Sequence, residues 1–142
     1  MDIPSKLHLQ IVSADRSLVN EQVDEVEIPG AEGYFGVLPG HTSLLALLGT
    51  GELWYRIGQD RTYLAVAFGF AEIQPDRVTV LAQIAEQATE IDVARAEAAK
   101  RRAEERLHGH QPGIDIDFER ARIAMLKSLI RLQVASRARI RS

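Results

Sequence analysis

Four histidines are the side chains of this sequence best suited to metal binding or acid–base chemistry, and their spacing favours neither. His108 and His110 stand two residues apart in a stretch with glycine and proline, and two imidazoles without a third ligand do not form a typical zinc site. His8 is isolated. His41 ends a turn, where a hydrogen bond between the ring and a backbone group is the expected role. The histidines therefore predict no metal or catalytic centre.

The sequence also lacks the patterns of nucleophilic catalysis and nucleotide hydrolysis. Ser13 and Ser17 have no accompanying base pattern, and no G-x-x-x-x-G-K-[ST] motif is present. A small-molecule enzyme built on a β-sandwich would need paired acids or a nucleophile that converge on a cavity, and the strands do not indicate them. We therefore predict that the chain alone is not an enzyme.

Basic side chains of the last segment indicate an anionic partner. From residue 120 to 142 there are seven basic residues and no acid. On a helix, Arg120, Lys127 and Arg131 fall within about 40° of one another. A solvated basic face is the alternative interpretation. An adaptor for nucleic acid would also use this segment, although aromatic residues for base stacking are missing and the first half is acidic.

The distribution of charge divides the chain into two parts. Residues 1–87 contain five basic and 12 acidic residues, a net charge of −7, whereas residues 88–142 contain 12 basic and eight acidic residues, a net charge of +4. Such a split predicts two units with different partners. No cysteine, no membrane-spanning apolar run and no targeting signal are present, so we expect the protein to work where it is made, in a reducing compartment.

The first half has the pattern of short strands. Leu7, Leu9 and Ile11 alternate with other residues, and further apolar runs follow at 23–28, 53–57, 62–68, 70–73 and 77–82. Alternation with period two at this spacing is typical of an antiparallel sandwich or flattened barrel.

Residues 28–45, IPGAEGYFGVLPGHTSLL, predict a folded turn system and not a linker. Four glycines and two prolines are placed among apolar residues, so the chain must double back here. Val37 and Leu38 are expected to form a short buried strand within it.

The second half changes to a helical pattern. Either Thr89 or Asp92 is suited to cap a helix from residue 93 to about 107, and residues 108–113 end it. The predicted fold class is therefore α+β in two parts: an antiparallel β-sandwich or flattened barrel over 1–87, followed by an antiparallel α-helical hairpin over 88–142.

The second helix of this hairpin begins at Asp115 or Asp117 and carries one broad apolar face. A count of about 100° per residue assigns to that face Phe118, Met125, Leu126, Leu129, Ile130 and Leu132. We expect this face to be covered.

The turn system and four further segments resemble the epsilon-subunit family of bacterial and chloroplast rotary ATP synthases. The G-x-x-G-x-x-P-G-H pattern of the family is present as Gly33, Gly36 and Pro39-Gly40-His41. The other matching segments are GTGEL at 49–53, AFGFAE at 67–72, VTVLA at 78–82 and IDVARA at 91–96. Together they cover nearly the whole chain in order.

This resemblance implies a non-catalytic subunit in the central stalk of a proton-driven ATP synthase. By the family pattern, the sandwich of residues 1–87 binds the γ subunit and the proteolipid c-ring. The hairpin of residues 88–142 regulates the enzyme: when extended, it reaches the catalytic β subunit, and α, and inhibits ATP hydrolysis. No nucleic-acid partner is implied. The expected location is peripheral, on the cytoplasmic face of a bacterial cell membrane and not on the chloroplast thylakoid.

The resemblance also assigns contact residues. The turns at 28–41 are the expected edge for ring and stalk contact, with Glu32, Tyr34, Phe35 and His41. Tyr34 and Phe35 stand where some members carry an acid followed by an aliphatic residue, so this contact is expected to be more aromatic and less charged. The inhibitory contact is assigned to the basic residues Arg120, Lys127 and Arg131, which would pair with an acidic segment of the β subunit.

ATP is a regulatory ligand that the resemblance implies, and no cofactor is required. Some members fold the two tail helices around one ATP through an (I/L)-D-x-x-R-A motif. The matching positions here are Glu86, Ile91, Asp92, Arg95, Ala96, Arg102, Lys127 and Arg131. Lys127 replaces the arginine of the best binders, and lysine lacks the planar fork that grips phosphate, so weaker binding is expected. The alternative needs no nucleotide: Asp92 caps the helix and Arg95 pairs with it.

Overall fold

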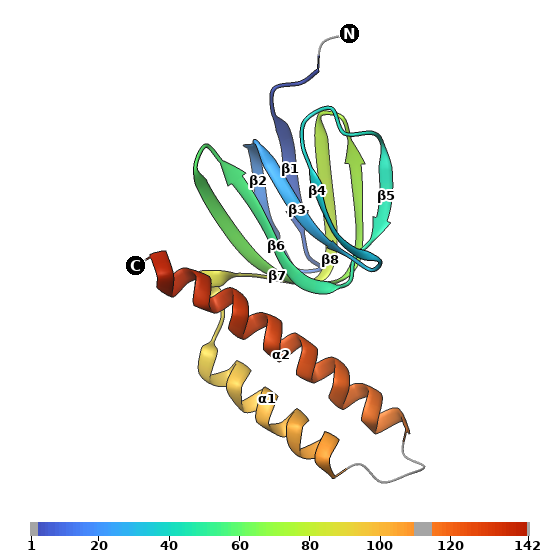
Figure 1. Ribbon diagram of the computed structural model, residues 1–142, viewed down its shortest axis with the longest axis vertical. Helices are drawn as coiled ribbons and strands as arrows, with labels where there is room; N and C mark the ends of the chain where they lie inside the picture. Colours follow the sequence, from blue (N-terminus) through green and yellow to red (C-terminus); the bar gives the residue numbers. More distant parts are fainter. Residues whose placement is uncertain (1–2, 110–114, 142) are drawn as a thin grey trace. The chain divides into compact units, whose positions relative to one another are not determined.

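The computed structural model describes residues 3–109 and 115–141, and side chains at 3–109 and 118–138. It forms two compact units, residues 1–87 and 88–142. The first contains β1 (Leu7–Val12), β2 (Ser17–Val23), β3 (Glu25–Gly30), β4 (Gly33–Val37), β5 (Leu44–Leu47), β6 (Thr50–Ile57), β7 (Asp60–Gln74) and β8 (Arg77–Gln87) (Figure 1). The second contains a short 3-10 helix, η1 (Ala88–Glu90), and the helices α1 (Val93–His108) and α2 (Asp115–Arg141). The predicted fold class is confirmed.

The eight strands of the first unit form one folded sheet in the order β2-β1-β8-β7-β6-β3-β4, and β5 pairs with β7 outside this path. All described pairs are antiparallel except β1 with β8, which are parallel. The alternating residues Leu7, Leu9 and Ile11 are fully buried, as period-two patterning predicts. Two strands were not anticipated from the sequence, β2 and β5, because neither shows a clear alternation of apolar and polar residues.

β7 is one strand of 15 residues, where the sequence predicted two separate strands. Its first half pairs with β6 and its second half pairs with β5. The change occurs at Phe68 and Gly69, whose φ angles are +60° and +122°. A Cβ atom on Gly69 would lie 1.9 Å from the carbonyl oxygen of Leu81. Only glycine fits this bend, at which the sheet turns to close over the core.

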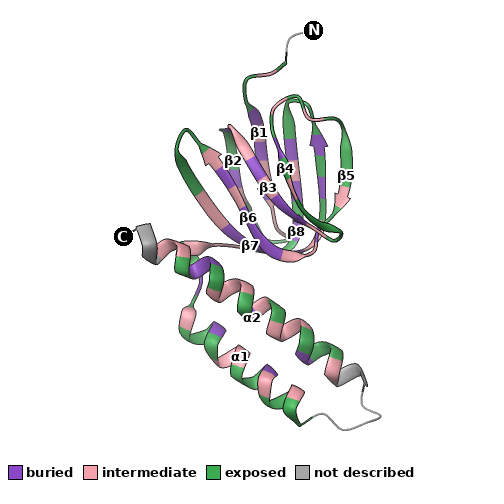
Figure 2. Ribbon diagram, viewed as in Figure 1, coloured by how far each residue is buried: buried purple, intermediate pink, exposed green. Residues whose placement is uncertain are grey.

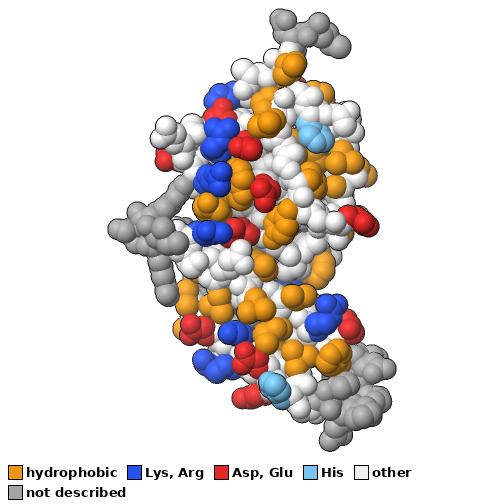
Figure 3. All heavy atoms as spheres, in the orientation of Figure 1, with side chains coloured by type: hydrophobic (Ala, Val, Ile, Leu, Met, Phe, Trp, Pro, Cys, Tyr) orange, Lys and Arg blue, Asp and Glu red, His pale blue; other side chains and the backbone are white. Residues whose placement is uncertain are grey.

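An ion cluster ties the loop after β2 to the β6–β7 turn. The Asp24 carboxylate pairs with Lys6 and accepts a hydrogen bond from the Gly58 N–H at 2.7 Å. The neighbouring Arg56 donates through Nε to Glu25 at 3.0 Å. Figure 3 shows basic and acidic side chains next to one another on this unit. The hydrogen bond from Lys6, followed by that from Gly58, holds the pKa of Asp24 below its usual value of 3.8.

This lowered pKa predicts how acid will act on Asp24→Asn. A carboxylate with a lowered folded-state pKa stabilises the fold above about pH 3.8, and loses that contribution as the pH falls through the lower folded value. The variant should therefore unfold at lower urea concentration than the parent at pH 7, and the difference should shrink below pH 3.8. Urea titrations followed by fluorescence of Trp54, the single tryptophan, measure it. A difference that is constant from pH 7 to pH 3 would contradict the role given to the carboxylate.

The second unit is an antiparallel pair of helices. Asp92 is the N-cap of α1, and its side chain accepts a hydrogen bond from the Arg95 N–H at 3.0 Å. At the other end of α1, the Gly109 N–H donates to the carbonyl of Glu105 at 2.9 Å. The predicted capping by Asp92 is confirmed. His110 lies outside the described residues.

Small residues form the contact between α1 and α2. The buried positions are Ala96 and Ala103 on α1 and Ala121, Ser128, Val134 and Ala135 on α2, each at most 4% exposed. All except Val134 are small, and these five small residues recur at intervals of seven on their helices. In Figure 2 the buried positions of α1 lie on the side toward α2. We call these five residues the alanine seam. A heptad spacing keeps one stripe facing the partner helix, and small side chains let the backbones approach closely.

The broad apolar face predicted for the second helix is therefore partly wrong. Leu126 and Leu129 are 41% and 42% exposed. Phe118, Met125, Ile130 and Leu132 are half-buried. The angular count locates large apolar residues correctly, but the buried positions of α2 are alanine, serine and Val134. The Ser128 hydroxyl enters the seam because it donates to the carbonyl of Ala124 at 2.8 Å.

Candidate functional site

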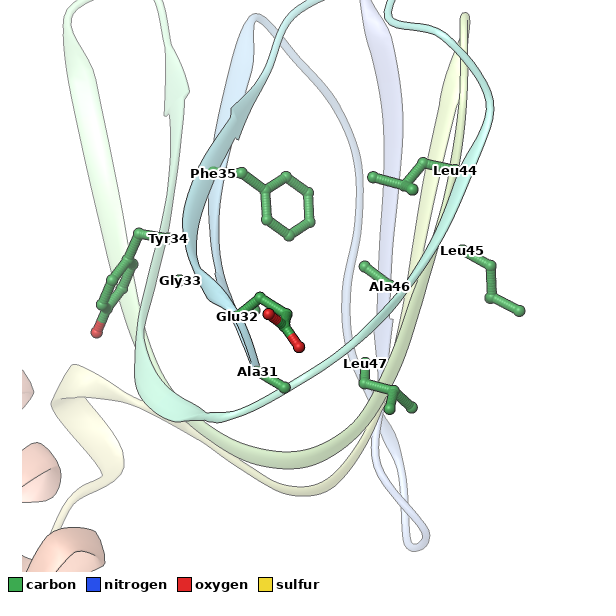
Figure 4. Close-up of a pocket in the computed structure, with 10 residues that line it drawn as sticks. Ala31, Glu32, Gly33, Tyr34, Phe35, Leu44, Leu45, Ala46 and Leu47 are labelled. Carbon is green, nitrogen blue, oxygen red and sulfur yellow. The ribbon is translucent and has the colours of Figure 1, made fainter.

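The predicted turn system forms one wall of a cleft in the sandwich. The β3–β4 hairpin lies opposite β5, and the two join at one end, where the Ala31 N–H donates to the Leu47 carbonyl at 2.8 Å and the Gly49 N–H donates to the Pro29 carbonyl at 2.9 Å. Above this junction the space between them has a volume of about 540 Å³. We call it the β4–β5 cleft, and its lining is mostly apolar: Gly30, Ala31, Glu32, Gly33, Tyr34, Phe35, Leu44, Leu45, Ala46 and Leu47 (Figure 4).

The two adjacent aromatic residues of the turn system have different roles. Figure 4 shows Phe35 pointing toward Leu44 and Tyr34 pointing to the other side of β4. Phe35 packs against the core of the sandwich. The Tyr34 hydroxyl accepts a hydrogen bond from the backbone N–H of Glu52 in β6 at 3.1 Å. Both residues line the cleft, but only Phe35 turns its ring toward Leu44. The Tyr34 ring anchors β4 to β6, although 54% of Tyr34 is exposed.

The other two residues assigned to this edge, Glu32 and His41, differ in exposure. Glu32 is exposed at the turn between β3 and β4. His41 is half-buried, and its Nδ1 donates to the carbonyl of Thr42 at 2.6 Å. The backbone bond expected for His41 is confirmed. Within the predicted buried strand, Val37 is buried, but Leu38 is 55% exposed and lies beyond the end of β4.

Sequence reasoning missed an apolar surface on the outer side of β5, β7 and β8. Leu47 lies opposite Phe70, and Phe70 lies opposite Leu81, so the three side chains share one face. They are 69%, 43% and 40% exposed, and Leu45 beside them is 67% exposed. We call these four residues the outer apolar row. The available signal was the run Leu44–Leu47, which is apolar throughout but carries no alternation to show which side is buried.

The residues of the ATP motif lie at the start of the helical unit, and two of them are used for packing. Ile91 is 8% exposed, and Ala96 is 3% exposed within the alanine seam. Asp92 already holds the backbone N–H of Arg95, while the Arg95 side chain is exposed. Glu86 is half-buried on β8, in the sandwich unit. The helical unit therefore brings together Ile91, Asp92, Arg95 and Ala96.

The basic residues of the tail are not one uniform solvated surface. Arg102 on α1 and Arg120 on α2 are exposed. Lys127 and Arg131 are half-buried, and each already makes an interaction within the chain. A partner that pairs with Lys127 or Arg131 must therefore replace existing interactions.

The described residues contain neither a membrane-spanning helix nor a group of metal ligands. No helix within 3–109 and 115–141 is long and apolar enough to cross a membrane. Where side chains are described, no group of three His, Asp or Glu residues is arranged to hold a metal ion. This finding does not cover the pair of His108 and His110, because His110 lies outside the residues whose side chains are described.

Comparison with protein families matches both units. Residues 6–88 match the family model of the β-sandwich domain of the ATP synthase delta/epsilon chain, and residues 89–136 match the long α-helix domain of the same chain. The chain is 47% identical over 132 residues to the ATP synthase epsilon chain of Syntrophobacter fumaroxidans, which covers 93% of this chain and 97% of that one. It is 42% identical over 135 residues to the epsilon chain of Solibacter usitatus, with 95% and 99% covered.

Solved structures agree with these matches. A chain in the mitochondrial ATP synthase of Euglena gracilis, in a structure of OSCP, F1 and the c-ring, has a TM-score of 0.76 and 25% identity, with 91% of this chain and 82% of that chain covered. A chain of the central stalk and c-ring structure from Tetrahymena thermophila has a TM-score of 0.55 at 10% identity, with 96% and 98% covered, and shows the shared fold alone. These matches give no support to a nucleic-acid adaptor. The chain therefore belongs to the ATP synthase delta/epsilon-chain family and is the epsilon subunit of an F-type ATP synthase.

Proposed function

We propose that this subunit is non-catalytic and works in the central stalk, where it couples proton flow to ATP synthesis and restrains ATP hydrolysis. The observation that carries the proposal is the difference between its two units. The sandwich has a full core of its own and exposes apolar side chains on one outer face, as a docking unit does. The buried side chains of the helical unit are mostly small, as suits a part that changes its conformation.

The sandwich docks on the γ subunit and on the c-ring. The outer apolar row, Leu45, Leu47, Phe70 and Leu81, is the surface we assign to γ, because contiguous exposed apolar side chains are unfavourable in water and favourable in an interface. The tip of the β3–β4 hairpin, with Glu32, is the part we assign to the ring. Copurification of the tagged chain with γ tests this directly. Replacing Leu47 and Phe70 with serine should abolish it, while replacing the exposed Gln22 and Asn20 on β2 should not.

The helical unit regulates hydrolysis. Each alanine methyl in the seam contributes on the order of 0.8 kcal/mol when buried, so the contact between α1 and α2 is weak compared with a leucine core. A ligand or partner with a modest preference for one state can then shift the equilibrium between paired and extended helices. In the extended state Arg120, Lys127 and Arg131 pair with an acidic segment of the catalytic β subunit, next to α, and block rotation.

ATP is the regulatory ligand that we propose for the helical unit. We propose that ATP binds to Asp92, Arg95 and the tail cations Lys127 and Arg131. Arg102 is a further proposed phosphate contact. Ile91 and Ala96 support this site through packing, because both are buried. Glu86 is assigned to the same ligand on the family pattern alone. No other cofactor is proposed.

Arg95→Ala should weaken ATP binding by about tenfold to a hundredfold, since a lost charged contact costs roughly 1.5 to 3 kcal/mol. Residue 95 keeps its backbone N–H in this variant, so the hydrogen bond to the Asp92 cap is retained. Lys127→Arg should strengthen binding, because arginine grips phosphate in two places. Calorimetric titration with ATP measures both effects, and Arg101→Ala on the same helix is the matched control. If no heat of binding is measured at millimolar ATP while the helices are folded, the proposed ATP site is contradicted. Asp92 would then act only as a helix cap.

The location that follows is peripheral, on the cytoplasmic face of a bacterial cell membrane, where the subunit is held by the rest of the complex. Washing isolated membranes with a chelator of divalent cations at low ionic strength releases peripheral complexes. The chain should leave the membrane together with the catalytic subunits.

A further inference from the structure

The β4–β5 cleft is bounded by two strands that are each paired on one side only. β4 ends the strand order and pairs with β3, and β5 pairs with β7 alone among the described strands. Such open edges present backbone donors and acceptors to any strand that approaches, and proteins usually protect them with charged residues, proline or bulges. β5, Leu44–Leu47, carries none of these protections. This edge is therefore available for pairing.

The register of β5 identifies the backbone groups on its open edge. The Leu48 N–H donates to the Gly69 carbonyl on β7 at 2.9 Å, so Ala46, two residues before it, also turns toward β7. Leu45 and Leu47 then turn their backbone groups the other way, toward the cleft. The Leu47 carbonyl confirms this alternation, since it accepts from the Ala31 N–H of the β3–β4 hairpin. What remains on the open edge is the N–H and the carbonyl of Leu45 and the N–H of Leu47.

The side chains around this edge define what a docked strand must carry. Inside, the cleft offers Phe35, Leu44 and Ala46 and has a volume of about 540 Å³, which suits apolar side chains. Outside, Leu45 and Leu47 continue into the outer apolar row. A strand next to β5 would place alternate side chains on these two sides.

Charge decides between the possible occupants. Residues 1–87 carry a net charge of −7, and Glu32 is the one ionisable acid that lines the cleft. A second copy of this chain would bring another −7 to the same edge, which opposes pairing, whereas a basic segment is attracted.

We propose that the β4–β5 cleft docks an extended, basic segment of a neighbouring subunit, which pairs with the open edge of β5 and inserts every second side chain, an apolar one, between Phe35 and Leu44. The inference rests on the proposed docking of the sandwich in the complex, and it adds the mode of recognition: backbone pairing supplies affinity, and the cleft selects the side chains.

Hydrogen exchange of the chain alone and of the assembled ATP synthase tests the pairing. The amides of Leu45 and Leu47 should exchange readily in the free chain and become protected on assembly, whereas the Ala46 amide, already turned to β7, should change little. Assembly without protection at these two amides overturns the inference and leaves the proposed function intact. Failure to assemble at all counts against the proposed function. Protection that appears in the free chain and rises with its concentration identifies a second copy as the occupant, and also overturns it.

Variants of Leu45 separate backbone pairing from side-chain contact. Leu45→Pro removes the open-edge N–H without touching the bonds to β7, and Leu45→Ala keeps that N–H while it removes the same apolar side chain. Affinity for the synthase depleted of this chain should be about 2- to 10-fold lower for proline than for alanine, the effect of one lost hydrogen bond. Equal affinities would contradict the pairing, provided circular dichroism shows both variants folded. Glu32→Gln should weaken binding, and Glu21→Gln on β2 should not.

Discussion

An ATP synthase assembled with residues 1–87 alone should hydrolyse ATP faster than the enzyme with the full chain. The sandwich should keep its structure in this variant, because every described strand and the hydrophobic core cluster of the sandwich lie within residues 1–87. The inhibitory helices are absent, so the increase should be on the order of 5- to 150-fold, the usual range of a regulatory coupling free energy. The rate of ATP hydrolysis by the purified complex measures it, with the content of the shortened chain checked on the same sample.

A triple replacement tests whether the basic residues or the apolar residues of α2 make the inhibitory contact. Changing Arg120, Lys127 and Arg131 to alanine should relieve inhibition while helix content is preserved, since alanine is the better helix former. Added salt should have the same effect on the parent, because exposed pairs are screened within about 10 Å at 0.1 M. If the triple variant inhibits as strongly as the parent, the exposed Leu126 and Leu129 become the contact instead. A truncated chain that does not assemble would refute the division of roles between the units.

Gly69→Ala should prevent the sandwich from folding stably. The new Cβ would lie 1.9 Å from the Leu81 carbonyl oxygen, and the residue would keep a φ of +122°. Overpacking costs about 1 to 3 kcal/mol, and the unfavourable backbone conformation adds about 1 to 2, so we expect the free energy of unfolding to fall by roughly 2 to 5 kcal/mol. Urea titration followed by Trp54 fluorescence measures the free energy of unfolding, and assembly with γ should be lost in parallel.

Two other glycines serve as controls for this prediction. A Cβ on Gly58 meets nothing within 4 Å, but its φ is +62°, so Gly58→Ala isolates the backbone term of about 1 kcal/mol. Gly36 has open space and no left-handed φ, so Gly36→Ala should be nearly neutral. If Gly69→Ala lowers the free energy of unfolding no more than Gly58→Ala does, the sheet adapts at the bend. The close approach of the Leu81 carbonyl would then not limit residue 69 to glycine.

Local patterns were sufficient for the class of fold and for several details. Period-two alternation at Leu7, Leu9 and Ile11 predicted buried strand positions, and the change of period after residue 87 predicted helices. Residue type and position predicted either Thr89 or Asp92 as the cap of the first helix, and the structure shows Asp92. The G-x-x-G-x-x-P-G-H run and the IDVARA segment pointed to the family to which the chain belongs. In each case the information lies within a few neighbouring residues.

Only the tertiary structure decided which surfaces are open and which side chains meet. Leu45, Leu47, Phe70 and Leu81 are apolar, yet they are exposed because they lie on the outer face of β5, β7 and β8. Tyr34 and Phe35 are neighbours, yet the Tyr34 hydroxyl binds the backbone of β6, whereas the Phe35 ring points across the cleft toward Leu44.

The helices differ from the prediction for the same reason. Leu126 and Leu129 were expected to be covered, and both are exposed, whereas the alanine seam is buried. The sequence determined the elements, because hydrophobic period and capping act between residues that are close along the chain. Exposure depends on which elements come together, and that is set by backbone approach distances between residues far apart in the sequence, such as Gly69 and Leu81.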